Sequence, residues 1–338
     1  MDTATHFVIG LGLGAMAHLS PEVAANPALG LAITIGTVVA SEAPDSDFLY
    51  KIKGTSAYLK NHRRWTHSIP AWFVWPTFIT FGLSLTFQGI PWGLVWLWCF
   101  AAVLVHVGTD ILNTFGAVPL LPFSKKRLSF DVLQVFDPVL FISQLLGLVL
   151  WWSGAASPGP LFLGINSFTV IYIAARCLFR RKAELVVARE IKGQSNARYS
   201  LMPTFHLTNW KAVIETADGF RLGTIRHGRF EEDMKLNSAS EPSVRVNIEP
   251  LTRLISHRDI SETFFSIAKH IYREVEVHDN RIRVILTDLR FRYGQYFPFR
   301  AVFELDGEGT LLSERLCSKS DMRLGIGVQE SPGFVSTS

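Results

Sequence analysis

Six apolar runs alternate with polar connections over the first half of the chain. They cover residues 7–19, 28–41, 69–87, 92–109, 138–153 and 161–179. The last four approach the ~20 residues that a membrane-spanning helix needs, so the pattern predicts a membrane α-helical bundle. The first two runs are short and rich in glycine, and they are either full spans with polar ends or helices that the others shelter.

The basic residues of the connections predict how these helices are oriented. The connections at 42–68 and 110–136 carry all of the Lys and Arg of residues 1–175, and "RRK" follows the last run at 180–182. The alternate connections at 20–27, 88–91 and 154–160 carry none. Under the positive-inside rule, the basic connections and both termini are cytoplasmic. The sequence therefore predicts about six transmembrane helices in an N-in/C-in topology, with Trp92, Trp151 and Trp152 at the opposite interface.

The second half of the chain has a different composition. Of the 33 Lys and Arg, 25 follow residue 175. Strand-like alternation in "HLTNWKAVIETADGFRLGTIR" and "RIRVILTDLRFRYGQYFPFRAVFELDGEGTL" is broken by Asp-Gly turns at Asp218 and Asp306. A helix is expected over "SETFFSIAKHIYREVE", with Ser261 as its cap. We therefore expect a membrane domain at 1–182, a strand-rich cytoplasmic α+β domain at 195–320 and a disordered tail at 321–338.

The remaining composition narrows the classes of partner. The net charge of +4 is mild, so no nucleic-acid partner is predicted. Cys99, Cys177 and Cys317 are far apart in the sequence. They indicate neither a disulfide framework nor a cysteine-based zinc site.

Histidine and aspartate side chains gather at the predicted cytoplasmic ends of the helices. His6 opens the first apolar run, and "EAPDSDF" ends the second. "HRRWTHS" precedes the third run, and "HVGTDILNTFG" ends the fourth. The connections were assigned from Lys and Arg alone, so this convergence is independent information. The candidate metal ligands are His6, Asp45, Asp47, His62, His67, His106 and Asp110.

These residue types suit a divalent metal ion. Imidazole and carboxylate ligands fit zinc, manganese or iron, and zinc or manganese is expected here, as one ion or two. His106 and Asp110 lie one helical turn apart and share a face. Bound metal lowers the pKa of water to roughly 7 and so supplies a nucleophile. The predicted catalytic residues are Asp47, as a base or nucleophile, and Arg63 and Arg64, which suit a phosphate or another anionic group.

Each of these residues also has a structural explanation. His6 could be a packed helix residue, and "PDSD" could form only a turn and a helix cap. His106 and Asp110 could bond to each other, and the arginines could serve only to orient the helices. Asp137 is most simply the N-cap of a helix that begins at Pro138. Together these residues support a functional site more strongly than any one of them does. Ionisable groups near a membrane are energetically costly and are usually kept for a function.

The ordered motifs resemble a known family. "THFVIGLGLGAMAH", "PDSDF", "HRRWTHS", "HVGTDILNTFGAVPLLPFS" and "DP" together are similar to the YdjM-like family of LexA-binding, inner membrane-associated, predicted metal-dependent hydrolases. The resemblance covers roughly residues 1–155. It implies a bacterial cytoplasmic-membrane protein and a metal-dependent hydrolase, with the candidate ligands above in the matching motif positions. The additional cytoplasmic domain resembles longer versions found in spore-forming Gram-positive bacteria.

The sequence is compatible with three functions. The leading hypothesis is a membrane-bound metal-dependent hydrolase that acts at the inner leaflet on a phosphoester or lipid headgroup. The alternative is a non-enzymatic membrane regulator or scaffold, with a structural or sensory metal and a cytoplasmic domain that binds a protein partner. An ion transporter is disfavoured, because transport sites typically lie near the bilayer midplane and these acids cluster at one face.

Overall fold

The computed structural model describes residues 1–237, 259–278, 281–294 and 296–317. The chain divides into two compact units. Unit 1 comprises Met1–Ile52, Asn61–Arg181 and Pro203–Thr208, and unit 2 comprises Lys53–Lys60, Lys182–Met202 and Asn209–Ser338. The disordered tail expected at 321–338 lies outside the described residues.

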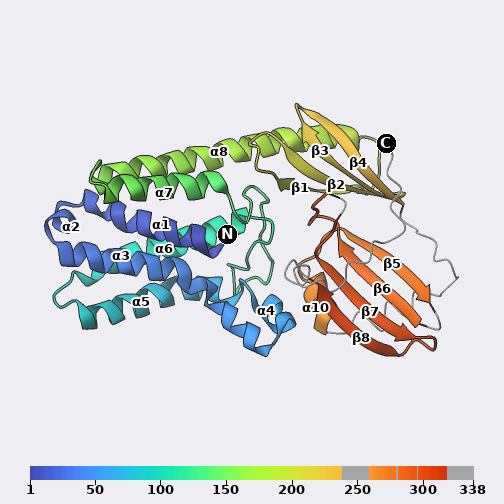
Figure 1. The fold of residues 1–338 in the computed structure, drawn as a ribbon, viewed down its shortest axis with the longest axis horizontal. Coiled ribbons are helices and arrows are strands. Elements are labelled where there is room, and N and C mark those ends of the chain that lie inside the picture. The colour runs from blue at the N-terminus through green and yellow to red at the C-terminus, as the bar shows by residue number, and fades with distance from the viewer. Residues whose placement is uncertain (238–258, 279–280, 295, 318–338) are drawn as a thin grey trace. The chain divides into compact units, whose positions relative to one another are not determined.

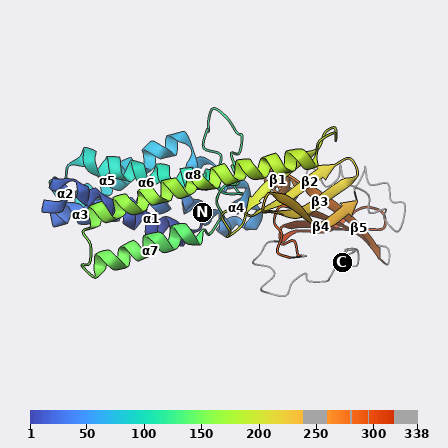
Figure 2. The ribbon, with the colours of Figure 1, turned by 90° about the horizontal axis from the view of Figure 1, so that it is seen from above.

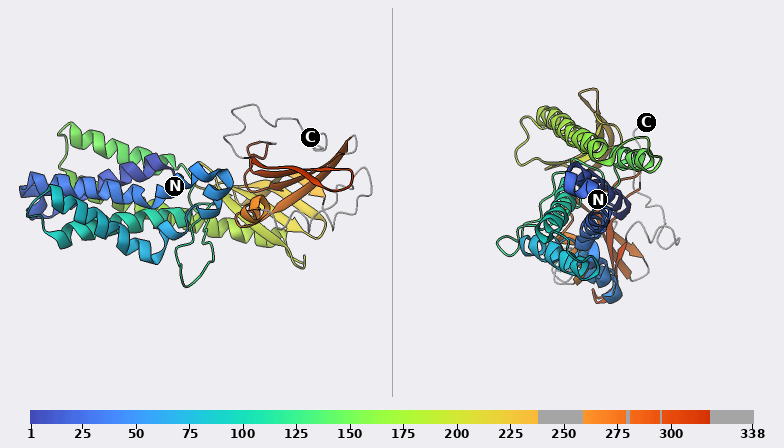
Figure 3. Two further views of the ribbon diagram at one scale, coloured as in Figure 1. Left: turned by 90° about the horizontal axis from the view of Figure 1, so that it is seen from below. Right: turned by 90° about the vertical axis from the view of Figure 1, so that its left-hand side faces the viewer.

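Unit 1 is a bundle of helices that run along one common direction (Figures 1 and 2). Its long helices are α1 (Thr3–Met16), α3 (Pro27–Glu42), α5 (Ile69–Thr86), α6 (Trp92–Leu112), α7 (Pro138–Trp152) and α8 (Pro158–Glu190). The short elements η1 (Ala17–Leu19), α2 (Pro21–Ala25), η2 (Ala43–Lys53), α4 (Thr55–Asn61) and η3 (Trp65–His67) connect them, with α4 assigned largely to unit 2. The right panel of Figure 3 views the bundle nearly end-on.

Four segments of the described chain are long and apolar enough to cross a membrane. They are Pro27–Lys53, which joins α3 to η2, and the helices α5, α6 and α8. Large apolar side chains such as Phe78, Leu85 and Ile171 point out of the bundle, as lipid-facing residues do. Thr3–Leu19 and Pro138–Trp152 are shorter apolar helices. The structure thus has four candidate spans, the run 138–153 that was expected to be long forms the shorter helix α7, and the six-span arrangement stays a prediction.

The glycine-rich first helix packs closely against its neighbours. Ile9 and Leu13 of α1 lie in a core with Ile33 of α3 and Val103 of α6. Toward α3, a Cβ added to Gly14 would lie 2.6 Å from the Cα atom of Thr34. Small residues where two helices meet allow their backbones to approach each other closely. Close packing therefore explains why this run is rich in glycine.

Unit 2 contains two four-stranded antiparallel sheets. The first has the order β1-β2-β3-β4, with strands Arg198–Pro203, Trp210–Thr216, Gly219–Arg226 and Arg229–Asn237. The second has the order β5-β6-β7-β8, with strands Ile271–His278, Arg281–Asp288, Arg300–Asp306 and Leu311–Cys317. Both predicted Asp-Gly turns are confirmed, since Thr216 pairs with Gly219 and the Asp306 carboxylate accepts from the backbone N–H groups of Glu308 and Thr310.

The two sheets share one core and a buried polar link. Met202 and Val213 of the first sheet pack with Tyr272 of the second sheet and with Leu289, which follows β6. His270 precedes β5 and bonds to Glu215 Oε2 and Ser200 Oγ, each at 2.9 Å. Burial lowers the pKa of His270, so the ring is neutral at pH 7 and donates one hydrogen bond while accepting another.

One predicted element of unit 2 is wrong. The helix expected from Ser261 through "SETFFSIAKHIYREVE" is only α10 (Asp259–Phe265), and the segment is extended from Ile271 onward as β5. Residues 271–278 pair in continuous register with β6, from Ile271–Asp288 to His278–Arg281. Antiparallel pairing with the next strand, β6, outweighs the local helix preference of Glu and Arg in "IYREVEV".

The α1–α3 contact yields a stability prediction. We expect Gly14→Ala to lower the free energy of unfolding by about 1–3 kcal/mol, because the new methyl group overlaps a backbone atom of α3. The matched control is Gly82→Ala on α5, where an added Cβ meets nothing within 4 Å. Thermal unfolding of the detergent-purified variants measures both. Equal melting temperatures for the two variants would contradict this account of the packing.

Candidate metal centre

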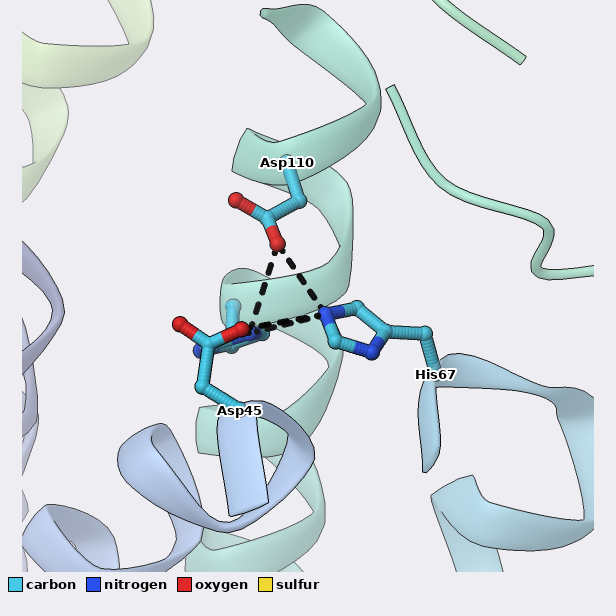
Figure 4. Close-up of side chains that lie close together, drawn as sticks. Asp45, His67 and Asp110 are labelled. Carbon is cyan, nitrogen blue, oxygen red and sulfur yellow. Dashed lines mark hydrogen bonds and ion pairs between the residues drawn. The ribbon is translucent and has the colours of Figure 1, made fainter. Parts of the chain in front are cut away.

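Four side chains from three segments of unit 1 converge at one end of the bundle. His106 and Asp110 lie on α6, one turn apart. Asp45 lies in η2, directly after α3, and His67 lies in η3, directly before α5. Figure 4 shows Asp45, His67 and Asp110 pointing toward one another from these three elements. One ligand atom from each of the four lies within 4.8 Å of all the others.

Five of the six distances within this cluster are close to the edges of a tetrahedron. His67 Nε2 lies 3.2 Å from His106 Nε2 and 3.0 Å from Asp110 Oδ2. His106 Nε2 lies 3.5 Å from Asp110 Oδ2, and Asp45 Oδ1 lies 3.6 and 3.7 Å from the two imidazole nitrogens. Metal–ligand bonds of about 2.0–2.1 Å place tetrahedral ligands about 3.3 Å apart. A single ion at the centre would therefore be within bonding reach of all four atoms.

The hydrogen bonds around the two histidines leave electron pairs facing this centre. His106 Nδ1 lies 2.6 Å from the Ser41 carbonyl oxygen, which can only accept, so Nδ1 carries the proton. His67 Nδ1 lies 3.0 Å from Thr66 Oγ1, and that hydroxyl donates to Asp47 Oδ2 at 3.3 Å, so His67 Nδ1 donates to it. Both neutral rings then present the Nε2 lone pair to each other. Outer partners of this kind fix the tautomer of metal-ligating histidines.

An unpartnered carboxylate oxygen supports the same interpretation. Asp45 Oδ1 is buried and has no hydrogen-bond donor. Such an oxygen is costly to bury unless a cation or donor compensates it. Two neutral imidazoles and two carboxylates carry a charge of −2; Arg63 and the Met1 amino group lie against Asp110, and the Asp45 carboxylate still faces the centre without a cation. Burial lowers the pKa of His67 well below its usual range, so the ring stays in the neutral form that binds metal. The donor set therefore fits a divalent ion.

His6 lies against this cluster from α1. Its ring stacks on His106 with centroids 3.7 Å apart, and its Nε2 lies 3.3 Å from Asp110 Oδ1. The amino group of Met1 pairs with the same Asp110 oxygen. Asp110 thus directs one oxygen to the His67–His106 side and the other to His6 and Met1.

Asp47 and His62 form a second group with Asp45, and their ligand atoms also lie within 4.8 Å of one another. The oxygens of Asp47 already have donors, with His62 Nδ1 2.9 Å from Oδ1 and the backbone N–H of Arg63 2.7 Å from Oδ2. Thr66 adds the hydroxyl contact described above. In this arrangement Asp47 holds the segment that carries His67.

The two predicted catalytic arginines face different surroundings. Arg63 is buried, with Nε 2.9 Å from Asp110 Oδ2 and two further bonds to Asn113 Oδ1 and the Met1 carbonyl oxygen. Arg64 is half-buried. Burial, together with the charges of Arg63 and Arg64, lowers the pKa of the neighbouring Arg127 to about 10. A concentrated positive charge therefore lies beside the acidic cluster.

Several supporting residues were missing from the sequence prediction. Asn113 accepts from Arg63 and from the backbone N–H groups of Phe115 and Gly116, and it shapes the end of α6. Glu42 has a buried Oε1 without a donor, one turn before Asp45. Both belong to motifs that the sequence analysis quoted, but amide and backbone partners have no spacing signal of their own. Asp137 is confirmed as the N-cap of α7, since it accepts from Val139 and Leu140.

Comparison with known proteins covers both parts of the chain. Residues 1–183 match the YdjM inner membrane protein family. The chain belongs to this family. Residues 250–320 match the YfhP C-terminal alpha/beta plait domain. The chain is 33% identical over 318 residues to the uncharacterized protein YfhP of Bacillus subtilis (strain 168), which covers 93% of this chain and 94% of that protein.

No solved structure shows a significant match to the chain. Membership of the YdjM family confirms the resemblance drawn from the ordered motifs, and it supports a membrane location. The matched region contains every residue of the four-ligand cluster.

The difference between Asp45 and Asp47 gives a prediction about metal affinity. We expect Asp45→Asn to abolish high-affinity zinc or manganese binding, because it replaces a ligand. Asp47→Asn should weaken the Kd about 10–100-fold and leave the stoichiometry at saturation unchanged, as loss of an outer partner does. Competition with a metal chelator measures both values on the detergent-purified protein.

His18→Ala is the control, since His18 lies in η1, beyond the far end of α1, and bonds to Gly14 and Ala15 carbonyl oxygens. It should bind metal as the wild type does. Equal affinity losses in Asp45→Asn and Asp47→Asn would contradict the distinction between ligand and support.

Proposed function

We propose that this YdjM-family protein is a membrane-bound, metal-dependent hydrolase that acts at the inner leaflet. The proposed substrate is a phosphoester, with the phosphoester of a lipid headgroup as the first choice. The observation that carries the proposal is the set of four electron-pair donors at tetrahedral spacing, formed by Asp45, His67, His106 and Asp110. Zinc or manganese is the proposed ion. The other predicted ligands, His6, Asp47 and His62, are proposed as outer partners of this one site, because they already bond to Asp110 or to one another.

The chemistry divides between the ion and the chain. When bound, a divalent ion polarises a phosphoryl oxygen and makes a water molecule more acidic. Asp45 is the most solvent-accessible of the four ligands, with 17% of its side chain exposed, so substrate and water would approach from its side. Arg63 holds Asp110 in place through its Nε contact. Arg64, with its partly exposed side chain, is the proposed partner of the anionic group.

Asp47 is proposed as a positioning residue. Both of its oxygens accept hydrogen bonds from the segment 62–66, and its side chain is almost fully buried. An acid or base role for Asp47 would require one of these bonds to open. The contacts favour a role in fixing the orientation of His67 through Thr66.

The proposed topology places this site at the cytoplasmic surface. It has six spans, both termini inside and the basic connections 42–68 and 110–136 on one face. The candidate spans Pro27–Lys53, α5 and α6 all have an end near the cluster, since Asp45, His67 and Asp110 lie at those ends. A substrate at headgroup depth could therefore reach the ligands without entering the hydrocarbon core.

A turnover assay tests the proposal. The full chain is reconstituted in nanodiscs with zinc or manganese and is offered phospholipids and chromogenic phosphomonoesters and phosphodiesters, with release of phosphate or alcohol measured. We expect His67→Ala to reduce kcat/KM at least 100-fold and Arg64→Ala to raise KM with a smaller effect on kcat. His18→Ala should match the wild type. Turnover that persists in His67→Ala, or metal-loaded wild type without turnover on any of these substrates, would overturn the proposal.

A second candidate function is a non-enzymatic regulator that binds a cytoplasmic protein partner through unit 2. This candidate is favoured because the potential metal ligands are confined to one unit. Among the described residues, both potential metal-ligand groups lie in unit 1. Unit 2 instead contributes two sheets with a shared core. Full occupancy by metal without turnover, together with a protein that crosslinks to unit 2 in cells, would favour this candidate.

A further inference from the structure

The loop between α6 and α7 exposes apolar side chains beside a basic cluster. We call residues 119–130 the 119–130 loop. Phe123 is 83% exposed and Phe130 is 53% exposed. Lys125 and Lys126, between them, are also exposed. Exposed aromatic residues of this size are unfavourable in water, at about 25 cal/mol per Å² of apolar surface, so their clustering indicates a surface that something covers.

Hydrogen bonds close the base of the part of this loop that carries Phe123, Lys125 and Lys126. Ala117 and Leu128 exchange two backbone hydrogen bonds, of 3.0 and 2.8 Å. The Arg127 guanidinium donates to the carbonyl oxygens of Phe115, Gly116 and His62. The exposed tip is thus carried on a closed base, and Arg127 joins this base to the segment that bears the metal-site residues.

The loop is also bonded directly to the metal-site segment. The N–H of Val118 donates to the Arg63 carbonyl oxygen at 2.8 Å, and the N–H of Ile69 donates to the Pro119 carbonyl oxygen at 3.0 Å. Ile69 is the first residue of α5, and the loop follows α6 in the chain. Both helices are candidate spans. The loop therefore lies where two spans end, at the level of a membrane surface.

The direction of the loop agrees with that position. Figure 2 and the left panel of Figure 3 show the loop after α6 extending sideways, across the axes of the helices. If the helices cross a bilayer, a segment with this direction runs along the bilayer surface. Aromatic and cationic side chains together favour such an interface, because the rings enter the headgroup–acyl boundary and lysines pair with anionic lipids.

We propose that the 119–130 loop binds the surface of an anionic lipid bilayer, with Phe123 inserted at the headgroup–acyl boundary and Lys125 and Lys126 paired with lipid phosphates. Through the Val118–Arg63 and Ile69–Pro119 bonds, this contact holds the metal-site segment at headgroup depth. The proposal goes beyond hydrolysis, because lipid binding by the loop does not require a bound metal or a reaction. It identifies the covering partner as lipid, since the loop is continuous with membrane spans and carries cations.

Spin-label accessibility tests the proposal independently of activity. The labelled site is Phe123→Cys in a full-length background with Cys177→Ser and Cys317→Ser, in which the remaining cysteine is buried. Oxygen partitions into lipid and a nickel chelate into water, so their ratio reports depth. Phe78→Cys on α5 is the lipid-facing reference and Leu312→Cys on β8 the water-facing one, as both native side chains are exposed.

In nanodiscs containing phosphatidylglycerol, we expect the oxygen-to-chelate ratio at position 123 to lie clearly above that at 312 and toward that at 78. A ratio equal to that at 312 would overturn the proposal. Protection of position 123 from both reagents would also overturn it and would indicate a protein partner.

A comparison of anionic and neutral lipid tests the contribution of Lys125 and Lys126 to membrane binding. Lys125→Glu combined with Lys126→Glu should lower the ratio at position 123 at least two-fold in phosphatidylglycerol discs and change it little in phosphatidylcholine discs. High salt should reduce the difference between the two lipids, because ions screen exposed charges. An unchanged ratio in the Glu variant would overturn the anionic-lipid component. Gel filtration and the spectrum at position 78 establish that each variant is folded.

Discussion

The structure of unit 1 depends on four electron-pair donors brought together at the end of an apolar bundle. His67 Nε2 and His106 Nε2 face each other at 3.2 Å, and both of their Nδ1–H groups are committed elsewhere. Asp45 Oδ1 faces the same point without a donor. In the neutral rings no N–H group points from one of these atoms to another. Burial of three such electron-pair donors without a cation or a hydrogen-bond donor would be strongly unfavourable. A divalent ion resolves the arrangement and explains why these residues meet.

The rest of unit 1 positions these donors. Glycines of α1 allow it to pack on α3, which places His6 beside His106 and directs the following η2 turn, with Asp45, toward α6. The Ser41 carbonyl oxygen near the end of α3 fixes the ring of His106. Asp47 and Thr66 do the same for His67, while Arg63 and Asn113 restrain Asp110. The ligands therefore rest on an outer layer of bonds from neighbouring segments, which is the arrangement that a preorganised site requires.

Much of this site could be predicted from the sequence, because its strongest signals are local. The i, i+4 spacing of His106 and Asp110 and the position of each motif at a helix end place the candidate residues on one face of the membrane. The geometry itself could not be predicted. Arg63 has a φ of +59°, and its side chain turns inward to Asp110, which a string of basic residues does not indicate. The division of Asp45 and Asp47 into ligand and support likewise depends on tertiary hydrogen bonds.

The fold of the second half shows the same limit. The alternation and Asp-Gly turns predict β2, β3, β6 and β7, whereas the Glu and Arg residues of β5 predict a helix, and its pairing with the next strand, β6, outweighs that preference. In unit 1 the long runs 69–87, 92–109 and 161–179 identified α5, α6 and α8, whereas the short run 28–41 is part of the candidate span Pro27–Lys53 and the run 138–153 forms the shorter helix α7. The helices α1 and α7 are shorter than the candidate spans, so their positions depend on packing against neighbouring helices, which hydropathy does not predict.

X-ray absorption spectroscopy at the zinc edge of the purified, zinc-loaded chain identifies the ligands of the metal centre. We expect about one equivalent of tightly bound zinc with a first shell of nitrogen and oxygen at about 2.0–2.1 Å and the multiple-scattering signature of two imidazoles. His106→Ala should remove one imidazole from that shell. A protein that retains no metal, or zinc bound without any imidazole, would contradict the claim that these four side chains form a metal centre.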